Sequence, residues 1–209
     1  MKIIKKGMHF SLVITLLLTL FSACVVEVND DNDDNNGTVM GSGTATLDGS
    51  TSTFSQGIIT YHGLYENSEF HTFDIAVGSS GINPIAQTGV GDALQLELLL
   101  SSSTFSGGRF VFSESETLAE NTIILGYYLI GVDASTQEAE KLYMVKDGTL
   151  DVSKTGDNYE LSYNFTVQEL STIFYLPIGD DKSLTGSYSG KLVYDDASAK
   201  STSKLNTTS

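Results

Sequence analysis

The sequence has few of the residues that build disulfides and metal sites. Its 209 residues include one cysteine, three histidines, two prolines and no tryptophan. One cysteine cannot form a disulfide within the chain. A structural zinc site needs about four ligands from Cys, His or acidic residues. We therefore expect no internal disulfide, no metal site and no cofactor.

Basic residues are also scarce. Lys and Arg together number 11 against 26 Asp and Glu, which gives a formal net charge of -15. A surface of this sign repels the phosphate backbone of nucleic acids. We therefore expect no nucleic-acid partner.

The first 24 residues have the three parts of a secretory signal. Three lysines stand within the first six residues, an apolar stretch runs from 10 to 21, and Ser22 and Ala23 precede Cys24. About 12 apolar residues are too few to cross the hydrocarbon core of a bilayer. The pattern is typical of a cleaved signal peptide. We therefore expect residues 1–23 to be removed.

The end of this signal resembles the lipobox of bacterial lipoproteins, in which the cysteine receives a diacylglycerol. The resemblance implies that Cys24 is lipidated and that the covalent lipid is the membrane partner of the protein. Each buried CH₂ of a lipid chain contributes about 0.8 kcal/mol, so several chains anchor a protein durably. Lipidation also explains an unpaired thiol in an exported chain.

Composition divides the rest of the chain into three segments. Residues 24–39 hold the lipidated cysteine and an Asp/Asn-rich run, which has too few apolar residues to collapse and is expected to act as an acidic tether. Residues 40–194 have the length of one domain. Residues 195–209 are polar and are expected to form a disordered tail. Removal of residues 1–23 takes away three lysines and no acid, which changes the net charge from -15 to -18.

Alternation of apolar and polar residues predicts strands throughout the domain. From Tyr159 to Val167 every second residue is Tyr, Leu, Phe or Val, and the leucines at 94–100 repeat the pattern. The segment 123–130 is apolar on both faces, which favours a central strand covered on both sides. We expect an all-β domain, a single antiparallel meander of about 8–10 strands that forms a barrel or a sandwich.

Some strand boundaries can also be predicted. We expect one continuous strand at 53–62, and two separate strands at 140–147 and 149–153. Short links with glycine or polar residues join most of these segments.

Two structural motifs mark the C-terminal part. A hairpin runs from Gly148 to Val167 with its turn at Gly156, and the last strand carries glycines at 186 and 190. With the lipobox, these motifs resemble β-rich lipoproteins of Bacteroidota over most of residues 41–194. The acidic run behind Cys24 resembles the export signals of surface lipoproteins in that group. The resemblance implies a lipid-anchored domain at the outer membrane, either surface-exposed or periplasmic, and supplies no catalytic residue.

Residues 168–182 depart from that pattern by an apolar insertion. Ile173, Phe174, Tyr175 and Leu176 stand where a short link is expected. The insertion is either an added edge strand or packed loop, or an exposed apolar patch that contacts a ligand or partner. These four residues are our candidate contact residues.

No enzyme motif is complete. The segment 186–190 has the glycines of a nucleophile elbow, but Tyr188 stands where the elbow requires Ser. Asp74, Asp92 and Glu97 lie in or beside strands and are the acids that a glycoside hydrolase would use, but nothing in the sequence selects a pair. We therefore predict that the protein is not an enzyme.

The remaining residues that could belong to a functional site are two histidines and five tyrosines. We expect His62 in a turn and His71 at the rim of the core. Exposed aromatic side chains would stack on sugar rings. The candidates for such stacking are Tyr61, Tyr65, Tyr127, Tyr128 and Tyr175.

These observations favour a non-enzymatic binding or structural module of the cell envelope, with a protein or a glycan as partner. Two alternatives stay open. One is a carrier that holds a small ligand or glycan in a barrel cavity. The other is a glycoside hydrolase.

Overall fold

The computed structural model describes residues 41–198, apart from residues 67, 84–85 and 116. Strands make up 71% of it. The expected signal peptide, Cys24, the tether and the end of the tail lie outside the described residues. Within those residues, no helix has the length and apolar character needed to cross a membrane.

Twelve strands follow one another along the chain. They are β1 (Gly41–Leu47), β2 (Ser50–Phe54), β3 (Gln56–Leu64), β4 (His71–Gly78), β5 (Ile82–Asn83), β6 (Thr88–Leu100), β7 (Gly108–Phe112), β8 (Thr122–Asp133), β9 (Lys141–Thr155), β10 (Asn158–Leu170), β11 (Pro177–Lys191) and β12 (Val193–Asp196).

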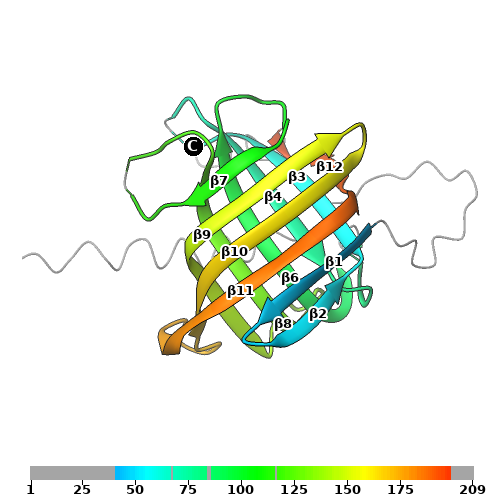
Figure 1. Cartoon of the computed structure of the whole chain (residues 1–209), viewed down its shortest axis with the longest axis vertical. Helices are drawn as coiled ribbons and strands as arrows, with labels where there is room; N and C mark the ends of the chain where they lie inside the picture. The colour runs from blue at the N-terminus through cyan, green and yellow to red at the C-terminus, as the bar shows by residue number, and fades with distance from the viewer. Residues whose placement is uncertain (1–40, 67, 84–85, 116, 199–209) are drawn as a thin grey trace, which may run out of the picture.

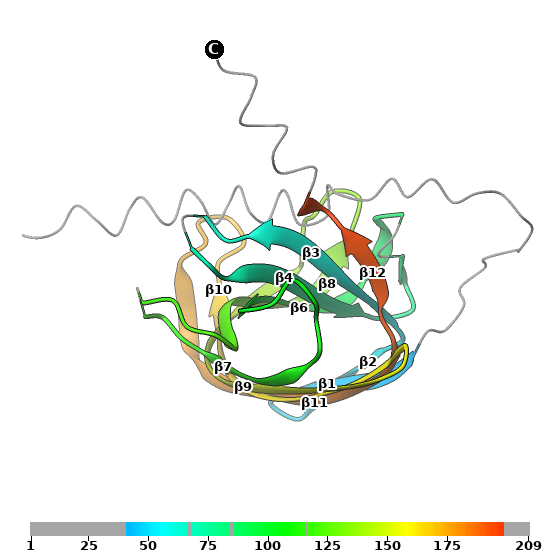
Figure 2. The same cartoon turned by 90° about the horizontal axis from the view of Figure 1, so that it is seen from above.

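Eleven of these strands form one curled sheet, a half-barrel, in the order β12-β3-β4-β6-β8-β7-β9-β10-β11-β1-β2. The short β5 pairs with β6 beside this path. In Figure 1 the strands β9, β10, β11, β1 and β2 lie toward the viewer, and we call them the front wall. Strands β3, β4, β6 and β8 form the back wall. Figure 2 shows the two walls facing each other across the interior.

The all-β prediction is confirmed, but the antiparallel meander is wrong. Strand β12 pairs with β3 in parallel, and β7 pairs with β8 in parallel. Strands β2 and β3 are consecutive in the chain yet lie near opposite edges of the sheet. The sheet is therefore mixed, and its order departs from the order of the sequence.

Ser55 is the corner that separates β2 from β3. Its N–H donates to the carbonyl of Gly78 at 2.9 Å, and its own carbonyl accepts from the N–H of Gly41 at 3.2 Å. These bonds hold the chain where it passes from the front wall to the back wall. The single strand expected at 53–62 is therefore two strands, because a corner made by backbone hydrogen bonds leaves no mark on the side-chain pattern.

The two strands expected at 140–147 and 149–153 are one strand, β9. Its pairing with β10 shifts between Thr166 and Val167, which is the signature of a β-bulge. Gly148 lies beside the bulge with φ of +127°, and a Cβ there would overlap the carbonyl oxygen of Asn164. The glycine thus allows the strand to bend and continue, rather than ending it.

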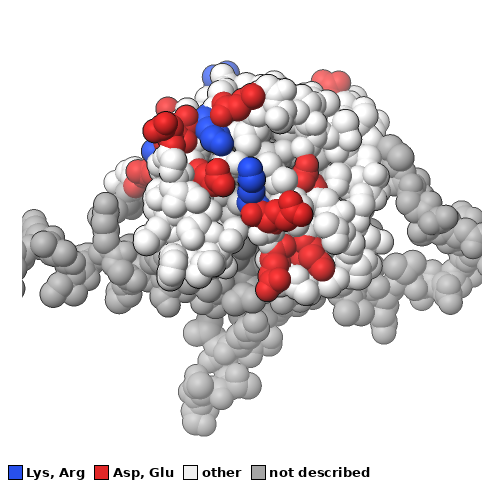
Figure 3. Space-filling view, turned by 90° about the horizontal axis from the view of Figure 1, so that it is seen from below, with Lys and Arg blue, Asp and Glu red and all other residues white. Residues whose placement is uncertain are grey.

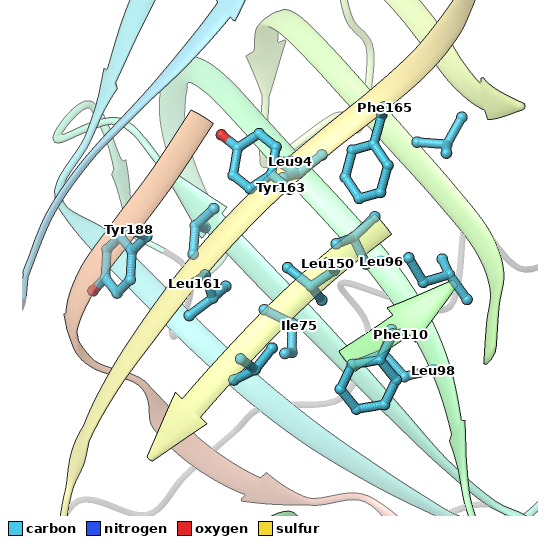
Figure 4. Packing of buried hydrophobic residues seen from close by; sticks show 14 of the residues in the cluster. Ile75, Leu94, Leu96, Leu98, Phe110, Leu150, Leu161, Tyr163, Phe165 and Tyr188 are labelled. Carbon is cyan, nitrogen blue, oxygen red and sulfur yellow. The ribbon is translucent and has the colours of Figure 1, made fainter. Parts of the chain in front are cut away.

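Side chains from both walls fill the interior. Leucines 94, 96 and 98 of β6 point inward from the back wall, and Leu161, Tyr163 and Phe165 of β10 point inward from the front wall (Figure 4). All six belong to one cluster of 27 buried apolar residues. Full burial of one such side chain contributes about 1.5–3 kcal/mol. The half-barrel is therefore held together by a packed apolar core.

Strand β8 is covered on both faces, as its sequence predicts. Tyr128 belongs to the interior cluster, whereas Tyr127 and Leu129 belong to a smaller buried cluster on the outside of the sheet. Leu142 of β9 and Leu170 of β10 join this outer cluster. The outer cluster supports the base of the β10–β11 hairpin.

The domain extends past its expected end at residue 194. Strand β12 runs to Asp196, Ala197 is buried, and the N–H of Ala197 donates to the carbonyl of Tyr61 at 2.8 Å. The start of the expected tail at residue 195 is therefore wrong. The sequence near residue 195 is acidic, so composition alone suggests a tail. These residues belong to the domain because their backbone pairs with β3, and composition does not reveal that pairing.

Candidate functional site

The β10–β11 hairpin ends in a group of exposed apolar side chains. The hairpin projects from the lower left of the molecule in Figure 1. The exposed fractions are 77% for Ile173, 69% for Phe174, 56% for Leu176 and 46% for Ile178. We call these four residues the apolar tip. They are half of the eight large apolar residues that are exposed in the described part of the chain.

Hydrogen bonds to Ser171 hold the backbone of the tip. The N–H of Ser171 donates to the carbonyl of Leu176 at 2.9 Å, and the N–H of Tyr175 donates to the carbonyl of Ser171 at 2.7 Å. The Oγ of Ser171 also accepts from the N–H groups of Ile173 and Phe174 at 3.4 and 3.3 Å. The apolar side chains are therefore presented on an ordered turn.

Tyr175 differs from its three neighbours. Its φ is +53°, and its side chain packs against the outer cluster rather than into solvent. It also lines a pocket of about 330 Å³ whose wall includes Leu129 and Leu142. The structure thus brings Ile173, Phe174 and Leu176 together at the surface, while Tyr175 fastens the turn to the sheet.

Charged residues of both signs lie at the base of the hairpin. Asp180 and Asp181 follow the tip on β11. Within the described residues two ion pairs lie here, Lys146 with Asp181 at 2.8 Å and Lys182 with Glu169 at 3.7 Å. Figure 3 shows the end from which the hairpin projects, where acidic side chains (red) outnumber basic ones (blue). The apolar tip is therefore bordered by charged side chains with a small excess of acids.

A second site, which the sequence did not reveal, lies on the outer face of the back wall. The pairing registers place Asp195, Thr60, Asp74 and Glu97 side by side on β12, β3, β4 and β6. We call these four residues the acid row. Neighbouring strands lie about 4.8 Å apart. Phe73, next to Asp74, points into the core, so Asp74 points outward.

The acid row is buried although it faces away from the core. The exposed fractions are 5% for Asp74 and 9% for both Glu97 and Asp195. Charged residues are seldom buried to this degree unless they are paired. In the described part of the chain, no Lys or Arg forms an ion pair with any of the three.

Within the described residues, His62 is the one basic group beside the acid row. It lies where the β3–β4 register shifts, and its Nε2 is 2.9 Å from Oδ2 of Asp74. Burial lowers the pKa of His62, but the hydrogen bond and charge of Asp74, with Glu97 and Asp195, outweigh burial and raise it above its ordinary value. The neighbouring carboxylates therefore stabilise the charged form of His62.

Burial favours the protonated form of Glu97. Burial, followed by the negative charge of Asp74, raises the pKa of Glu97 to about 8, and the charge of His62 opposes this shift. Two like charges directly opposite on neighbouring strands are destabilising. Protonation of Glu97 removes this repulsion from Asp74.

Three polar atoms at the acid row are buried and have no hydrogen-bond partner within the described residues. They are Oδ1 of Asp74, Oδ2 of Asp195 and the hydroxyl of Tyr127. Burial and the nearby charge of Glu97 raise the pKa of the Tyr127 hydroxyl. An unsatisfied buried polar group costs about 1–3 kcal/mol.

Among residues 41–198, leaving out residues 67, 84–85 and 116, no group of three or more His, Cys, Asp or Glu is arranged to hold a metal ion.

The position of one histidine differs from the expected position, and that of the other agrees with it. His62 lies within β3 rather than in the expected turn, because β3 continues to Leu64. His71 lies at the rim of the core, as predicted, and its Nδ1 is 2.8 Å from the hydroxyl of Tyr61.

The candidate tyrosines do not form one surface. Tyr128 lies in the interior, Tyr127 is buried on the outer face of the sheet, and Tyr61 packs against Phe73 with ring centroids 4.9 Å apart. Tyr65 is only half-buried. These rings do not make the shared platform that stacking on a sugar chain would require.

The front wall carries an open groove of about 470 Å³ on its outer face. Carboxylates and hydroxyls border it, including Asp151, Ser153, Glu160, Ser162 and Ser187. The outward side chains here are exposed, and Asp151 is paired with Arg109 at 3.3 Å. This arrangement is that of a solvated polar face.

One signal in the sequence marks the acid row in retrospect. Asp74 stands between Phe73 and Ile75, and Glu97 stands between Leu96 and Leu98. An acid at the outward position of an apolar strand is ordinary when that face is solvated. The pairing of Asp74 with Glu97 becomes visible only from the register of β4 with β6.

Comparison with protein-family models, with curated proteins and with solved structures gives no match to this chain.

Proposed function

We propose that this protein is a non-enzymatic, lipid-anchored binding module of the bacterial outer envelope, which contacts a protein partner through the apolar tip. The observation that carries the proposal is the concentration of four exposed apolar side chains on one hydrogen-bonded turn. Exposed apolar patches of this kind mark interaction sites. An ordered turn also lowers the entropy lost on binding.

The charges beside the tip define the chemistry of the partner. Glu169, Asp180 and Asp181 lie near it with Lys146 and Lys182, which leaves a small excess of acids, and the whole chain is acidic. We therefore expect an apolar groove on the partner, bordered by Lys or Arg side chains. Complementary charge of this kind speeds association and selects against acidic partners.

The anchor and tether suit such a role. Sixteen residues separate Cys24 from Gly41, where β1 begins. An extended segment of this length reaches at most roughly 55 Å. Lipid on Cys24 would hold the domain at the membrane, and the acidic tether would let the hairpin reach a partner in the same envelope.

The packing of the half-barrel favours this proposal over a carrier. The interior is filled by the cluster of 27 apolar side chains, and the two pockets considered above lie on the outside of the sheet. A carrier needs an enclosed volume of about 300–1,000 Å³ for its ligand.

The size of the native complex tests the proposal. Membranes from cells that produce the protein are solubilised in mild detergent, and the protein is followed on a native gel. We expect wild type to migrate as a complex larger than the single chain. The triple variant Ile173→Ser, Phe174→Ser, Leu176→Ser should migrate as the single chain.

A triple variant of the front wall, Ser162→Ala, Ser187→Ala and Thr185→Ala, is the matched control. It alters three exposed side chains away from the tip and should leave the complex intact. Equal migration of wild type and the tip variant would refute the proposal. A complex that contains only further copies of this chain would also refute it, since the partner would then be a second copy.

A further inference from the structure

We infer that the pocket beside the apolar tip receives the indole ring of a tryptophan from the protein partner. The pocket has a volume of about 330 Å³ and lies between the turn that follows β8 and the turn that follows β10. We call it the turn pocket. The inference rests on the proposed function, because it names the side chain that the partner would insert next to the apolar tip.

The turn pocket has an apolar floor. Leu129 of β8 and Leu142 of β9 are paired in the sheet and belong to the outer cluster, on which the side chain of Tyr175 also packs. Ala139 and Ile173 complete the apolar lining. An apolar cavity of about 150 Å³ holds a benzene ring. A pocket of about 330 Å³ therefore has room for two fused rings.

One acceptor in the wall of the pocket lacks a donor. Gln137 lines the pocket, and its Oε1 is buried with no hydrogen-bond partner within the described residues. The residue as a whole is only half-buried, which leaves its side-chain amide room to turn toward a ligand. An N–H group brought into the pocket would satisfy this oxygen, and a buried acceptor is costly while it stays unsatisfied.

An indole matches this lining better than other side chains do. It is a large apolar ring system with a single N–H, which is a donor only. A phenylalanine ring would leave Oε1 of Gln137 unpaired, and the single ring of a tyrosine would fill less of the volume. A lysine or arginine would place a charge over the apolar floor. Glu138, at the exposed rim, adds a further acceptor.

The backbone on both sides of the pocket is fixed in an uncommon conformation. Gln137 has φ of +61° and Tyr175 has φ of +53°, and they are two of the five non-glycine residues with positive φ in the described part of the chain. The N–H of Gln137 donates to the carbonyl of Asp133 at 2.7 Å, as the N–H of Tyr175 does to the carbonyl of Ser171. Strained residues of this kind gather at ligand-binding sites. The two turns therefore give the pocket a preformed shape.

The turn pocket is continuous with the apolar tip. Ile173 belongs to the tip and also lines the pocket. A partner that covers the tip therefore reaches the pocket within the same interface. Tryptophan is enriched among the few residues that dominate the binding free energy of an interface, and such residues lie in well-packed pockets.

Indole fluorescence tests the inference without background from this chain, because the chain contains no tryptophan. The probe is N-acetyl-tryptophanamide at a fixed low concentration, excited at the red edge of indole absorption and titrated with the full-length protein in mild detergent. We expect a saturable shift of the emission to shorter wavelength, with a Kd of about 1 mM or below.

Variants of the pocket make this test specific. Ala139→Phe places a ring inside the pocket and should abolish the shift. Ser135→Phe adds the same ring to the same turn at an exposed position outside the lining, and it is the matched control in the same detergent. If Ala139→Phe does not fold, Thr172→Phe replaces it, since Thr172 is an exposed residue of the lining.

A second probe tests the hydrogen bond to Gln137. The amide of N-acetyl-1-methyltryptophan has no indole N–H, so wild type should bind it at least fivefold more weakly than the parent amide. Gln137→Met removes the acceptor at similar side-chain length and should bring the two affinities within twofold of each other. Equal binding of both probes to wild type, or an unchanged ratio in Gln137→Met, would overturn the assignment to tryptophan.

The native complex separates a failure of this inference from a failure of the proposed function. Ala139→Phe should disrupt the complex as the tip variant does, and Ser135→Phe should not. A complex that is lost in the tip variant but kept in Ala139→Phe would overturn this inference and leave the proposed function in place. Absence of saturable binding of N-acetyl-tryptophanamide, or equal binding by wild type and Ala139→Phe, would also overturn this inference alone. Migration of wild type as the single chain would refute both.

Discussion

Asp74 and Glu97 stand directly opposite each other on β4 and β6, and both are buried. The described residues place no Lys or Arg in an ion pair with either. Two buried acids in such a register tolerate each other only while one of them holds a proton. This part of the back wall is therefore less stable than an apolar pair would make it, which is typical of sites kept for binding.

The pair makes the stability of the domain depend on pH. The folded-state pKa of Glu97 is about 8, against 4.5 in the unfolded chain. Between these values the folded state binds a proton that the unfolded state has released, so stability falls as pH rises through this window. We expect the melting temperature to be higher at pH 5.5 than at pH 8.5.

Glu97→Gln should remove most of this dependence. Glutamine has the shape of the protonated acid and cannot ionise, so we expect the variant to be more stable than wild type at pH 8.5. The control is Glu160→Gln, which removes the same charge at an exposed position. Equal slopes of melting temperature against pH in wild type and Glu97→Gln would contradict the assignment of the pH dependence to Glu97.

Gly186→Ala should destabilise the front wall. A Cβ at Gly186 would overlap the carbonyl oxygen of Thr44 on β1 and the ring of Tyr163 on β10. Overpacking against backbone costs about 1–3 kcal/mol. Gly78→Ala is the control, because its Cβ would meet atoms no closer than 3.5 Å. Thermal unfolding should show a loss of several degrees for the first variant and little change for the second. Equal melting temperatures would mean that the close packing of β11 with β1 and β10 is wrong.

The apolar tip should be dispensable for folding. Serine at 173, 174 and 176 replaces exposed side chains, so we expect the free energy of unfolding to change by less than about 0.5 kcal/mol. Tyr175→Ala removes a side chain that packs on the outer cluster and should cost about 1–2 kcal/mol. Denaturant unfolding of both variants gives the comparison. A large loss in the triple serine variant would assign the tip to folding rather than to binding.

Cys24→Ala should prevent lipidation. Cells that produce wild type and are fed labelled palmitate should yield labelled protein, and cells that produce the variant should not. The variant should also leave the membrane fraction or accumulate uncleaved. Label on the variant would contradict the lipoprotein assignment.

Side-chain alternation predicts strands because it records which face of each strand is buried. The pattern from Tyr159 to Val167 becomes β10, and the doubly apolar segment 123–130 becomes the covered strand β8. Alternation carries no information on backbone hydrogen bonds. The corner at Ser55 and the parallel strand β12 depend on such bonds, so they could not be predicted.

The two candidate sites differ in how far the sequence alone could predict them. The apolar tip is contiguous in sequence, so a local excess of Ile, Phe and Leu identifies it. The acid row gathers residues from four strands between residues 60 and 195, and only the register of the sheet brings them together.

Site-specific photo-crosslinking from the tip tests most directly whether the tip contacts a partner. A photoreactive phenylalanine analogue is placed at Phe174, and in a second variant at Ser187 on the exposed front wall, and cells that produce each variant are irradiated. We predict a discrete adduct with one other protein from position 174, no adduct from position 187, and loss of the first adduct when Ile173 and Leu176 are also serine. The absence of an adduct from position 174, an adduct at twice the mass of this chain, or equal adducts from both positions would contradict the proposal.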